Sequence, residues 1–176
     1  MTFPKAALLA VYLSVVALAA LQTPATHAQP ADPAEWKEAE VPAPPAFKTD
    51  GLLPFQIGQA SSLRFGVDPD TLKVGPDGVV RYVMVALSNS GAMNVWYEGV
   101  RCASGEVKTY AHWAAATATT AAGWQPRPEA EWRALVGSSA SRPALVLARE
   151  ALCNGRTVNG NERQILRDLR LGKPRD

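Results

Sequence analysis

Four apolar runs separated by turn residues occupy the middle of the chain, and they constrain its fold more than any other feature. Apolar and polar residues alternate in the first run, and the other three are rich in β-branched and aromatic side chains. Glycine, proline, serine, asparagine and aspartate fill the short connections, which permit only antiparallel pairing. The runs cover residues 63–67, 79–87, 93–102 and 107–113. They predict a small antiparallel meander of about four to six strands.

Two helical patterns follow the strands. Pro143–Cys153 starts with a proline that suits the first helical position and continues with several apolar residues. Asn161–Leu171 carries an apolar stripe and ends before Gly172. Because these helices come after the strands instead of alternating with them, we expect an α+β fold in which one or two C-terminal helices pack on the sheet.

Two shorter segments that contain proline also show a helical pattern. They are residues 33–39 and residues 128–133. Residues 114–122 consist only of alanine and threonine, whose opposed helix propensities cancel, and we expect a loop there.

The first 28 residues have the organisation of a secretory signal peptide. Lys5 is followed by an uncharged apolar run at residues 6–21, and Thr26 and Ala28 occupy the −3 and −1 positions of a cleavage site. A run of about 16 residues is shorter than the roughly 20 needed to span a bilayer. We therefore expect cleavage after Ala28, export to the periplasm and no membrane span in the mature chain. Gln29 stands where a lipoprotein would carry the cysteine that is lipidated.

Residues 29–54 contain six prolines. Proline fixes the backbone dihedral φ and removes an amide donor, so an extended conformation is favoured over a helix or a central strand. We expect a proline-rich N-terminal strap at 29–54, followed by a single α+β domain at 55–176. In this interpretation Trp36 covers an edge of the core.

The two cysteines, Cys102 and Cys153, both belong to the exported part of the chain. In an oxidising compartment an even pair predicts one disulfide, here between the end of a strand and the end of a helix. A metal site or a reactive thiol is the alternative. Both are weaker, because the chain has no Cys-x-x-Cys motif and His112 is the histidine that remains after cleavage. We expect no metal ion and no cofactor.

The formal net charge is only +2, and lysine and arginine are interspersed with carboxylates. A nucleic-acid-binding protein would cluster its basic residues on one face. We therefore expect no nucleic-acid partner. The expected partner is an unknown envelope component or protein, and the pattern does not specify an oligomeric state.

Several segments, taken in order, resemble the cryptic neisserial protein family. They are Trp36, Gly51–Phe55, Val67–Leu72, Val74–Tyr82 and Tyr97–Cys102. The resemblance implies an exported periplasmic protein of Gram-negative bacteria, in a family with many lipoproteins and no established activity. A weaker similarity is to the surface-adhesin E family, on the bend at Asp68–Thr71 and on Cys102.

The residues themselves do not form a recognisable catalytic motif. Nucleophilic hydrolysis needs a base beside the nucleophile, and a lone His112 at a strand end is more typical of a surface residue. Glu98 and Arg101 lie three apart on one strand, so their side chains point to opposite faces and each needs a partner elsewhere. Each charge either joins a cross-strand ion pair beside the disulfide or belongs to a binding groove. The candidate groove residues are Glu98, Arg101, Tyr97, Tyr82 and Trp96.

These observations predict a non-enzymatic binding or accessory domain of the cell envelope. A surface or secreted adhesin-like module is the alternative. An envelope enzyme that uses Glu98, Arg101 and His112 is a second alternative.

Overall fold

The computed structural model describes residues 36–58, 61–138 and 140–172. These residues belong to one compact unit that begins at Trp36. The predicted signal peptide and the start of the strap lie outside the described residues. No helix among the described residues is long and apolar enough to cross a membrane.

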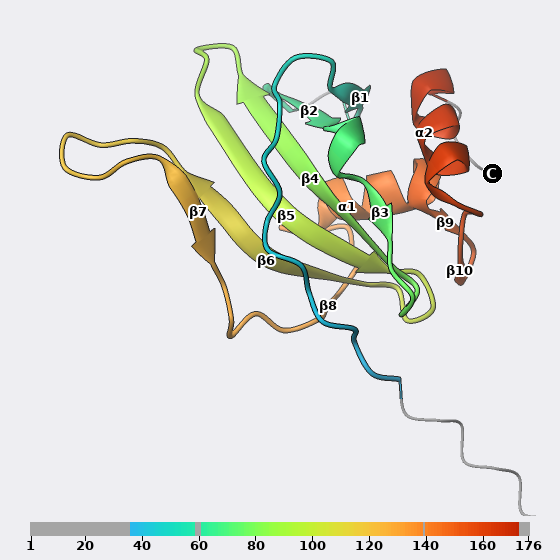
Figure 1. The fold of residues 1–176 in the computed structure, drawn as a ribbon. Coiled ribbons are helices and arrows are strands. Elements are labelled where there is room, and N and C mark those ends of the chain that lie inside the picture. The colour runs from blue at the N-terminus through green and yellow to red at the C-terminus, as the bar shows by residue number, and fades with distance from the viewer. Residues whose placement is uncertain (1–35, 59–60, 139, 173–176) are drawn as a thin grey trace, which may run out of the picture. The chain divides into compact units, whose positions relative to one another are not determined.

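An antiparallel sheet of eight strands forms the centre of the fold (Figure 1). Its six main strands are arranged in the order in which they occur along the chain. Of the other two strands, β3 pairs with β4 and β8 pairs with β6. The strands are β1 (Leu53–Phe55), β2 (Leu63–Val67), β3 (Lys73–Val74), β4 (Val79–Ser88), β5 (Met93–Arg101), β6 (Glu106–Ala114), β7 (Gly123–Pro126) and β8 (Arg133–Ala134). The predicted antiparallel meander and the α+β class are confirmed. The strands beyond the expected four to six are the short ones, which are too brief to produce a periodic pattern.

Strand β4 is apolar on both faces because both faces are covered. Val80, Tyr82 and Met84 belong to the core cluster beneath the helices, and Val83 and Val85 belong to a second cluster on the opposite face. We call these faces the helix side and the strap side. Side chains alternate along a strand, so a strand covered on both faces needs a continuous apolar run.

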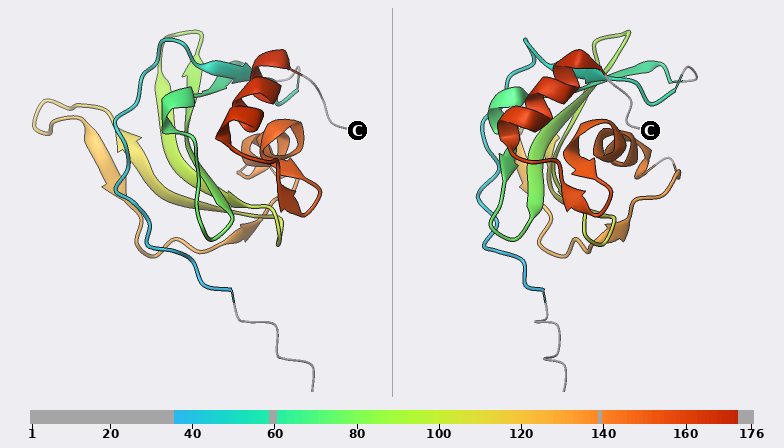
Figure 2. Two further views of the ribbon diagram at one scale, coloured as in Figure 1. Left: turned by 45° about the vertical axis from the view of Figure 1, so that its right-hand side comes forward. Right: turned by 90° about the vertical axis from the view of Figure 1, so that its right-hand side faces the viewer.

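Two helical segments cover the helix side (Figure 2). The first begins as α1 (Arg142–Leu147) and continues as a π-helical turn at Ala148–Leu152, in agreement with the predicted helix. A short hairpin of β9 (Cys153–Asn154) and β10 (Thr157–Val158) leads to α2 (Glu162–Leu171). The Asn161 side chain caps α2 by accepting a hydrogen bond from the Gln164 amide, and Gly172 ends it with φ of +56°.

The predicted disulfide joins Cys102, just beyond β5, to Cys153 at the end of the first helical segment. Their Cα atoms are 5.6 Å apart, within the range that a disulfide requires. The bond therefore ties the central sheet to the helices that pack on it.

The strap side is covered by the N-terminal segment. Residues 36–48 cross this face in an extended conformation without regular secondary structure. Val41, Phe47 and Leu52 pack against the second core cluster. The helix predicted at residues 33–39 is absent from the described residues 36–39, because the Trp36 indole and the Ala39 amide donate to Asp77 in the turn between β3 and β4.

The prediction of a helix at residues 128–133 is also wrong. Strand β7 ends at Pro126, and the next amide, that of Arg127, donates to the Tyr110 carbonyl at 2.8 Å. A turn closed by the Ala130 amide and the Arg127 carbonyl follows, and β8 then returns to the sheet. Pairing with β6 therefore overrides the local propensity of this segment.

Candidate functional site

The sheet separates the five predicted groove residues into two groups. Tyr82, Trp96 and Glu98 lie on the helix side, where Tyr82 is directly opposite Glu98 on the neighbouring strand. Tyr97 and Arg101 lie on the strap side. The expectation that Glu98 and Arg101 point to opposite faces agrees with this geometry. The five residues consequently do not line one common groove.

Glu98 is a buried carboxylate held by two hydroxyl groups. The Tyr82 hydroxyl donates to Oε2 at 3.2 Å, and Thr109 Oγ1 donates to Oε1 at 3.0 Å. Arg133 Nη2 donates to Thr109 Oγ1 at 3.4 Å. Burial raises the pKa of Glu98, and the two hydrogen bonds together with the Arg133 charge offset only part of this rise. Glu98 is therefore a core residue. Thr109 connects it by hydrogen bonds to Arg133, which is exposed.

A β-bulge changes the facing of β6 next to this cluster. The bulge lies opposite Tyr97 and Glu98, where Thr109 pairs with Glu98 and Ala111 pairs with Tyr97. Ala111 consequently joins Tyr110 on the strap side, whereas His112 lies opposite Trp96 and shares the helix side. His112 and Thr109 therefore open onto the same side of the sheet, and Arg101 does not.

Three adjoining hollows surround Arg127, and we call them the Arg127 hollows. Their volumes are about 350, 420 and 280 Å³. Thr109 and Arg133 line the first hollow, His112 lines the second, and strap residues line the third. The described lining residues are Val41–Pro44, Lys108, Thr109, Tyr110, His112, Pro126–Glu131 and Arg133. The rim thus offers both cations and carboxylates beside proline rings.

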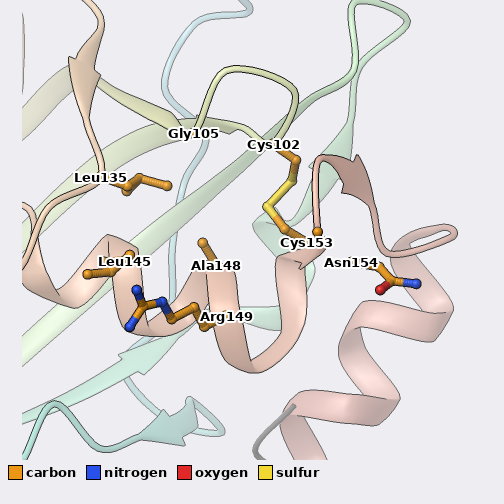
Figure 3. Close-up of a pocket in the computed structure, with 9 residues that line it drawn as sticks. Cys102, Gly105, Leu135, Leu145, Ala148, Arg149, Cys153 and Asn154 are labelled. Atoms are coloured by element: carbon orange, nitrogen blue, oxygen red, sulfur yellow. A yellow bond between two sulfur atoms is a disulfide. The ribbon is translucent and has the colours of Figure 1, made fainter. Parts of the chain in front are cut away.

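A further pocket of about 400 Å³ lies beside the disulfide (Figure 3). Leu135, Leu145 and Ala148 form its apolar wall, and Arg149 is the charged side chain among its described lining residues. The Cys102–Cys153 bond forms another wall. This pocket has one charged side chain among its described lining residues, whereas the Arg127 hollows have several.

Arg101 has two partners on the strap side. Its guanidinium lies 3.7 Å from the centre of the Trp36 ring, and Nη1 lies 3.9 Å from Glu106 Oε2 on the neighbouring strand. Of the two interpretations drawn from the sequence, the cross-strand ion pair fits Arg101. It does not fit Glu98, whose partners are hydroxyl groups.

Among the described residues, no group of three or more His, Cys, Asp or Glu side chains could hold a metal ion.

A family model, that of the CNP1-like family, matches residues 31–170. The chain belongs to the CNP1-like family. The predicted resemblance to cryptic neisserial proteins is therefore confirmed.

This member of the CNP1-like family is similar to cryptic neisserial protein 1 of Neisseria gonorrhoeae. The two chains are 28% identical over an alignment of 133 residues, and the match covers 69% of this chain and 65% of the relative. The match thus spans less than two thirds of that relative's length. A comparison with the solved structures found no match.

The sequence-based search missed a polar cluster on the strap side of this CNP1-like domain. Asp77 binds Arg81 through both carboxylate oxygens, at 3.2 Å to Nη1 and 2.7 Å to Nη2. The amides of Ala39 and Val79 also donate to Asp77. Burial raises the pKa of Asp77, but these four hydrogen bonds outweigh it and lower the pKa to about 2. One signal was visible in the sequence, namely a single arginine within the apolar run at residues 79–87.

The second part of this cluster holds Glu38 of the strap. Tyr110 donates to Oε1 at 2.6 Å, and Lys108 Nζ and Trp132 Nε1 donate to Oε2 at 3.0 and 3.3 Å. Arg81 Nη2 lies 3.6 Å from Oε1. No local pattern could have found this group, because its members come from distant parts of the chain.

Proposed function

We propose that this CNP1-like protein is an exported, non-enzymatic binding domain that acts in the periplasm on a component of the Gram-negative envelope. Three features support export and compartment: the organisation of residues 1–28, the disulfide, and the family. A bond of this kind persists in the periplasm and is rare in the cytosol.

The Arg127 hollows are the observation that carries the binding role. Arg127 and Arg133 supply guanidinium groups that can pair with carboxylates in a bidentate manner, and Glu129 and Glu131 supply acceptors for ammonium groups. A ligand with both charges fits this lining better than a purely anionic or purely apolar ligand. The stem peptides of peptidoglycan have this chemistry, so a soluble muropeptide is the first probe.

A non-enzymatic role is favoured by how the candidate catalytic residues are used. Glu98 is held in the core by Tyr82 and Thr109, and Arg101 lies on the other side of the sheet against Trp36. An enzyme that used Glu98, Arg101 and His112 together would need these side chains within reach of one substrate atom.

A titration of tryptophan fluorescence with soluble muropeptides tests the proposal. We expect saturable binding that the substitution Arg127→Ala weakens about tenfold, since it removes a charge-assisted contact of about 1.4 kcal/mol. Arg156→Ala removes another exposed arginine, in the β9–β10 turn, and is the matched control. Equal binding by both variants, or no binding by the unmodified protein to any envelope fraction, would count against the proposal.

Protease treatment of intact cells separates the periplasmic role from an adhesin-like role on the surface. We expect protection until the outer membrane is permeabilised. Digestion in intact cells would support the adhesin-like alternative instead.

A further inference from the structure

Residues 36–48 of the strap contact the sheet as a peptide ligand would, not as a strand. None of these residues, all of which the structure describes, pairs in the sheet. Their polar anchors are separate contacts, made by Glu38 and Ala39 near one end, by the Pro45 carbonyl further along and by Lys48 at the other end. A segment held in this way can leave without breaking any strand pairing.

The middle of this segment has the features of a proline-rich ligand. Pro42, Pro44 and Pro45 restrict it to an extended conformation, so little conformational entropy is lost when it binds. Trp124 Nε1 donates to the Pro45 carbonyl at 3.0 Å. Phe47 packs edge to face against Trp113 and Trp124, with ring centres 5.1 and 5.5 Å apart. Aromatic rings that combine with an indole donor are the usual means of recognising such segments.

A site for one carboxylate lies beside the aromatic rings. Lys108, Tyr110 and Trp132 donate to Glu38, and Arg81 stands at ion-pair distance. Among the described residues, Glu38 is the carboxylate that pairs with Lys108. Arg81, by contrast, has a bidentate partner, Asp77, that does not belong to the strap. A ligand that replaced the strap would consequently have to bring a carboxylate for Lys108.

The connection between this segment and β1 has the form of a hinge. Thr49, Asp50 and Gly51 are exposed, and Gly51 has φ of +73° with no atom near the position of a Cβ. Glycine adopts this conformation without strain, so the turn can reorient at low cost.

We infer that the strap groove, made of Asp77, Arg81, Lys108, Tyr110, Trp113, Trp124 and Trp132, is a binding site for a proline-rich, carboxylate-bearing segment of a partner protein, which residues 36–48 occupy in its absence. The cis segment defines the chemistry of the trans ligand: a glutamate for Lys108 and Tyr110, then prolines, then an aromatic ring. The groove shares Lys108 and Tyr110 with one of the Arg127 hollows. The inference nevertheless goes beyond the proposed function, since it concerns the surface that the strap covers and its test uses no envelope component.

The cis segment competes with any partner because its effective concentration is in the millimolar range for a short flexible connection. A partner therefore binds weakly until the cis contacts are loosened, and its apparent affinity falls with the fraction of open groove. Replacing Glu38 loosens the strap and leaves every groove residue in place.

The test measures fluorescence anisotropy of a labelled peptide with the sequence of residues 36–48, added to the full chain. We expect the Glu38→Ala chain to bind the peptide at least tenfold more tightly than the unmodified chain. Lys37→Ala changes an exposed neighbour in the same segment and should behave like the unmodified chain. A peptide carrying Glu38→Gln should lose the gain, and so should the double variant Glu38→Ala with Lys108→Ala.

Two results would overturn the inference. One is a folded Glu38→Ala chain that binds the peptide no better than the unmodified chain, with Glu38→Gln as the second variant if Glu38→Ala is unstable. The other is concentration-dependent dimerisation of Glu38→Ala that excludes the peptide, because the natural occupant would then be the strap of a second copy.

Discussion

The substitution Asp77→Asn probes the electrostatic centre of the strap side most sharply. The Asp77 side chain is only 2% exposed and pairs with Arg81, whose side chain is 5% exposed. Asparagine keeps the shape but leaves the Arg81 charge with Glu38 as its remaining carboxylate, at 3.6 Å. Breaking a buried pair from one side costs about 3–5 kcal/mol. We expect a loss of this size in the free energy of unfolding at pH 7.

The pH dependence of stability gives an independent magnitude for the same group. The pKa of Asp77 falls from 3.8 to about 2, and each pKa unit corresponds to about 1.36 kcal/mol, so ionised Asp77 stabilises the fold by about 2 kcal/mol. The pKa of Asp77 is lower in the folded state than in the unfolded state. This stabilisation is therefore present at pH values above the unfolded-state pKa of 3.8 and is lost as the pH falls toward the folded-state pKa of about 2.

Urea denaturation followed by tryptophan fluorescence, repeated between pH 7 and pH 2.5, measures both effects. The Asp77→Asn variant should be less stable at pH 7 and should lose less stability than the unmodified chain on acidification. Asp70→Asn removes an exposed carboxylate and is the matched control. The reasoning fails if Asp77→Asn keeps the full acid-induced loss of stability.

Two further predictions concern packing and covalent structure. Gly99→Ala should destabilise by about 1–3 kcal/mol, because its Cβ would lie 2.6 Å from the Tyr110 hydroxyl and 2.8 Å from Val79 Cγ1; Gly123→Ala, whose Cβ meets nothing within 4 Å, should be almost neutral in the same denaturation assay. Replacing Cys102 and Cys153 together by alanine should lower the free energy of unfolding by about 4 kcal/mol, since the bond closes a loop with a sequence separation of 51. A loss below about 1 kcal/mol would show that the disulfide does not restrain the chain as described.

The strands and helices were predictable because their signals are local. The run at residues 79–87 is apolar on both faces, and the turn residues after it leave a neighbouring antiparallel strand as the natural continuation. The cap of α2 and its apolar stripe are likewise contained within a few residues. The helical pattern at residues 128–133 was overridden by a bond that no local window contains, from the Arg127 amide to the Tyr110 carbonyl.

The candidate site was less predictable because it depends on register and on distant contacts. Alternation along β5 correctly separated Glu98 from Arg101, but grouping Tyr97 with its strand neighbours Trp96 and Glu98 ignored the same rule. The facing of His112 depends on the bulge in β6, which the sequence does not mark. The binding of Glu38 by Lys108 and Tyr110 joins residues about 70 positions apart, a distance at which single-sequence patterns carry no signal.

Amide chemical shifts of the isotopically labelled protein during titration with a soluble muropeptide test the central claim most directly. If the Arg127 hollows bind an envelope component, the largest changes fall on Thr109, His112, Arg127 and Ala130, and Arg127→Ala raises the muropeptide concentration needed to produce them about tenfold. Changes centred on Gly105, Ala148 and Gly155 would place the site beside the disulfide and contradict the account. A spectrum that does not change with muropeptide or with any other envelope component would contradict the binding role itself.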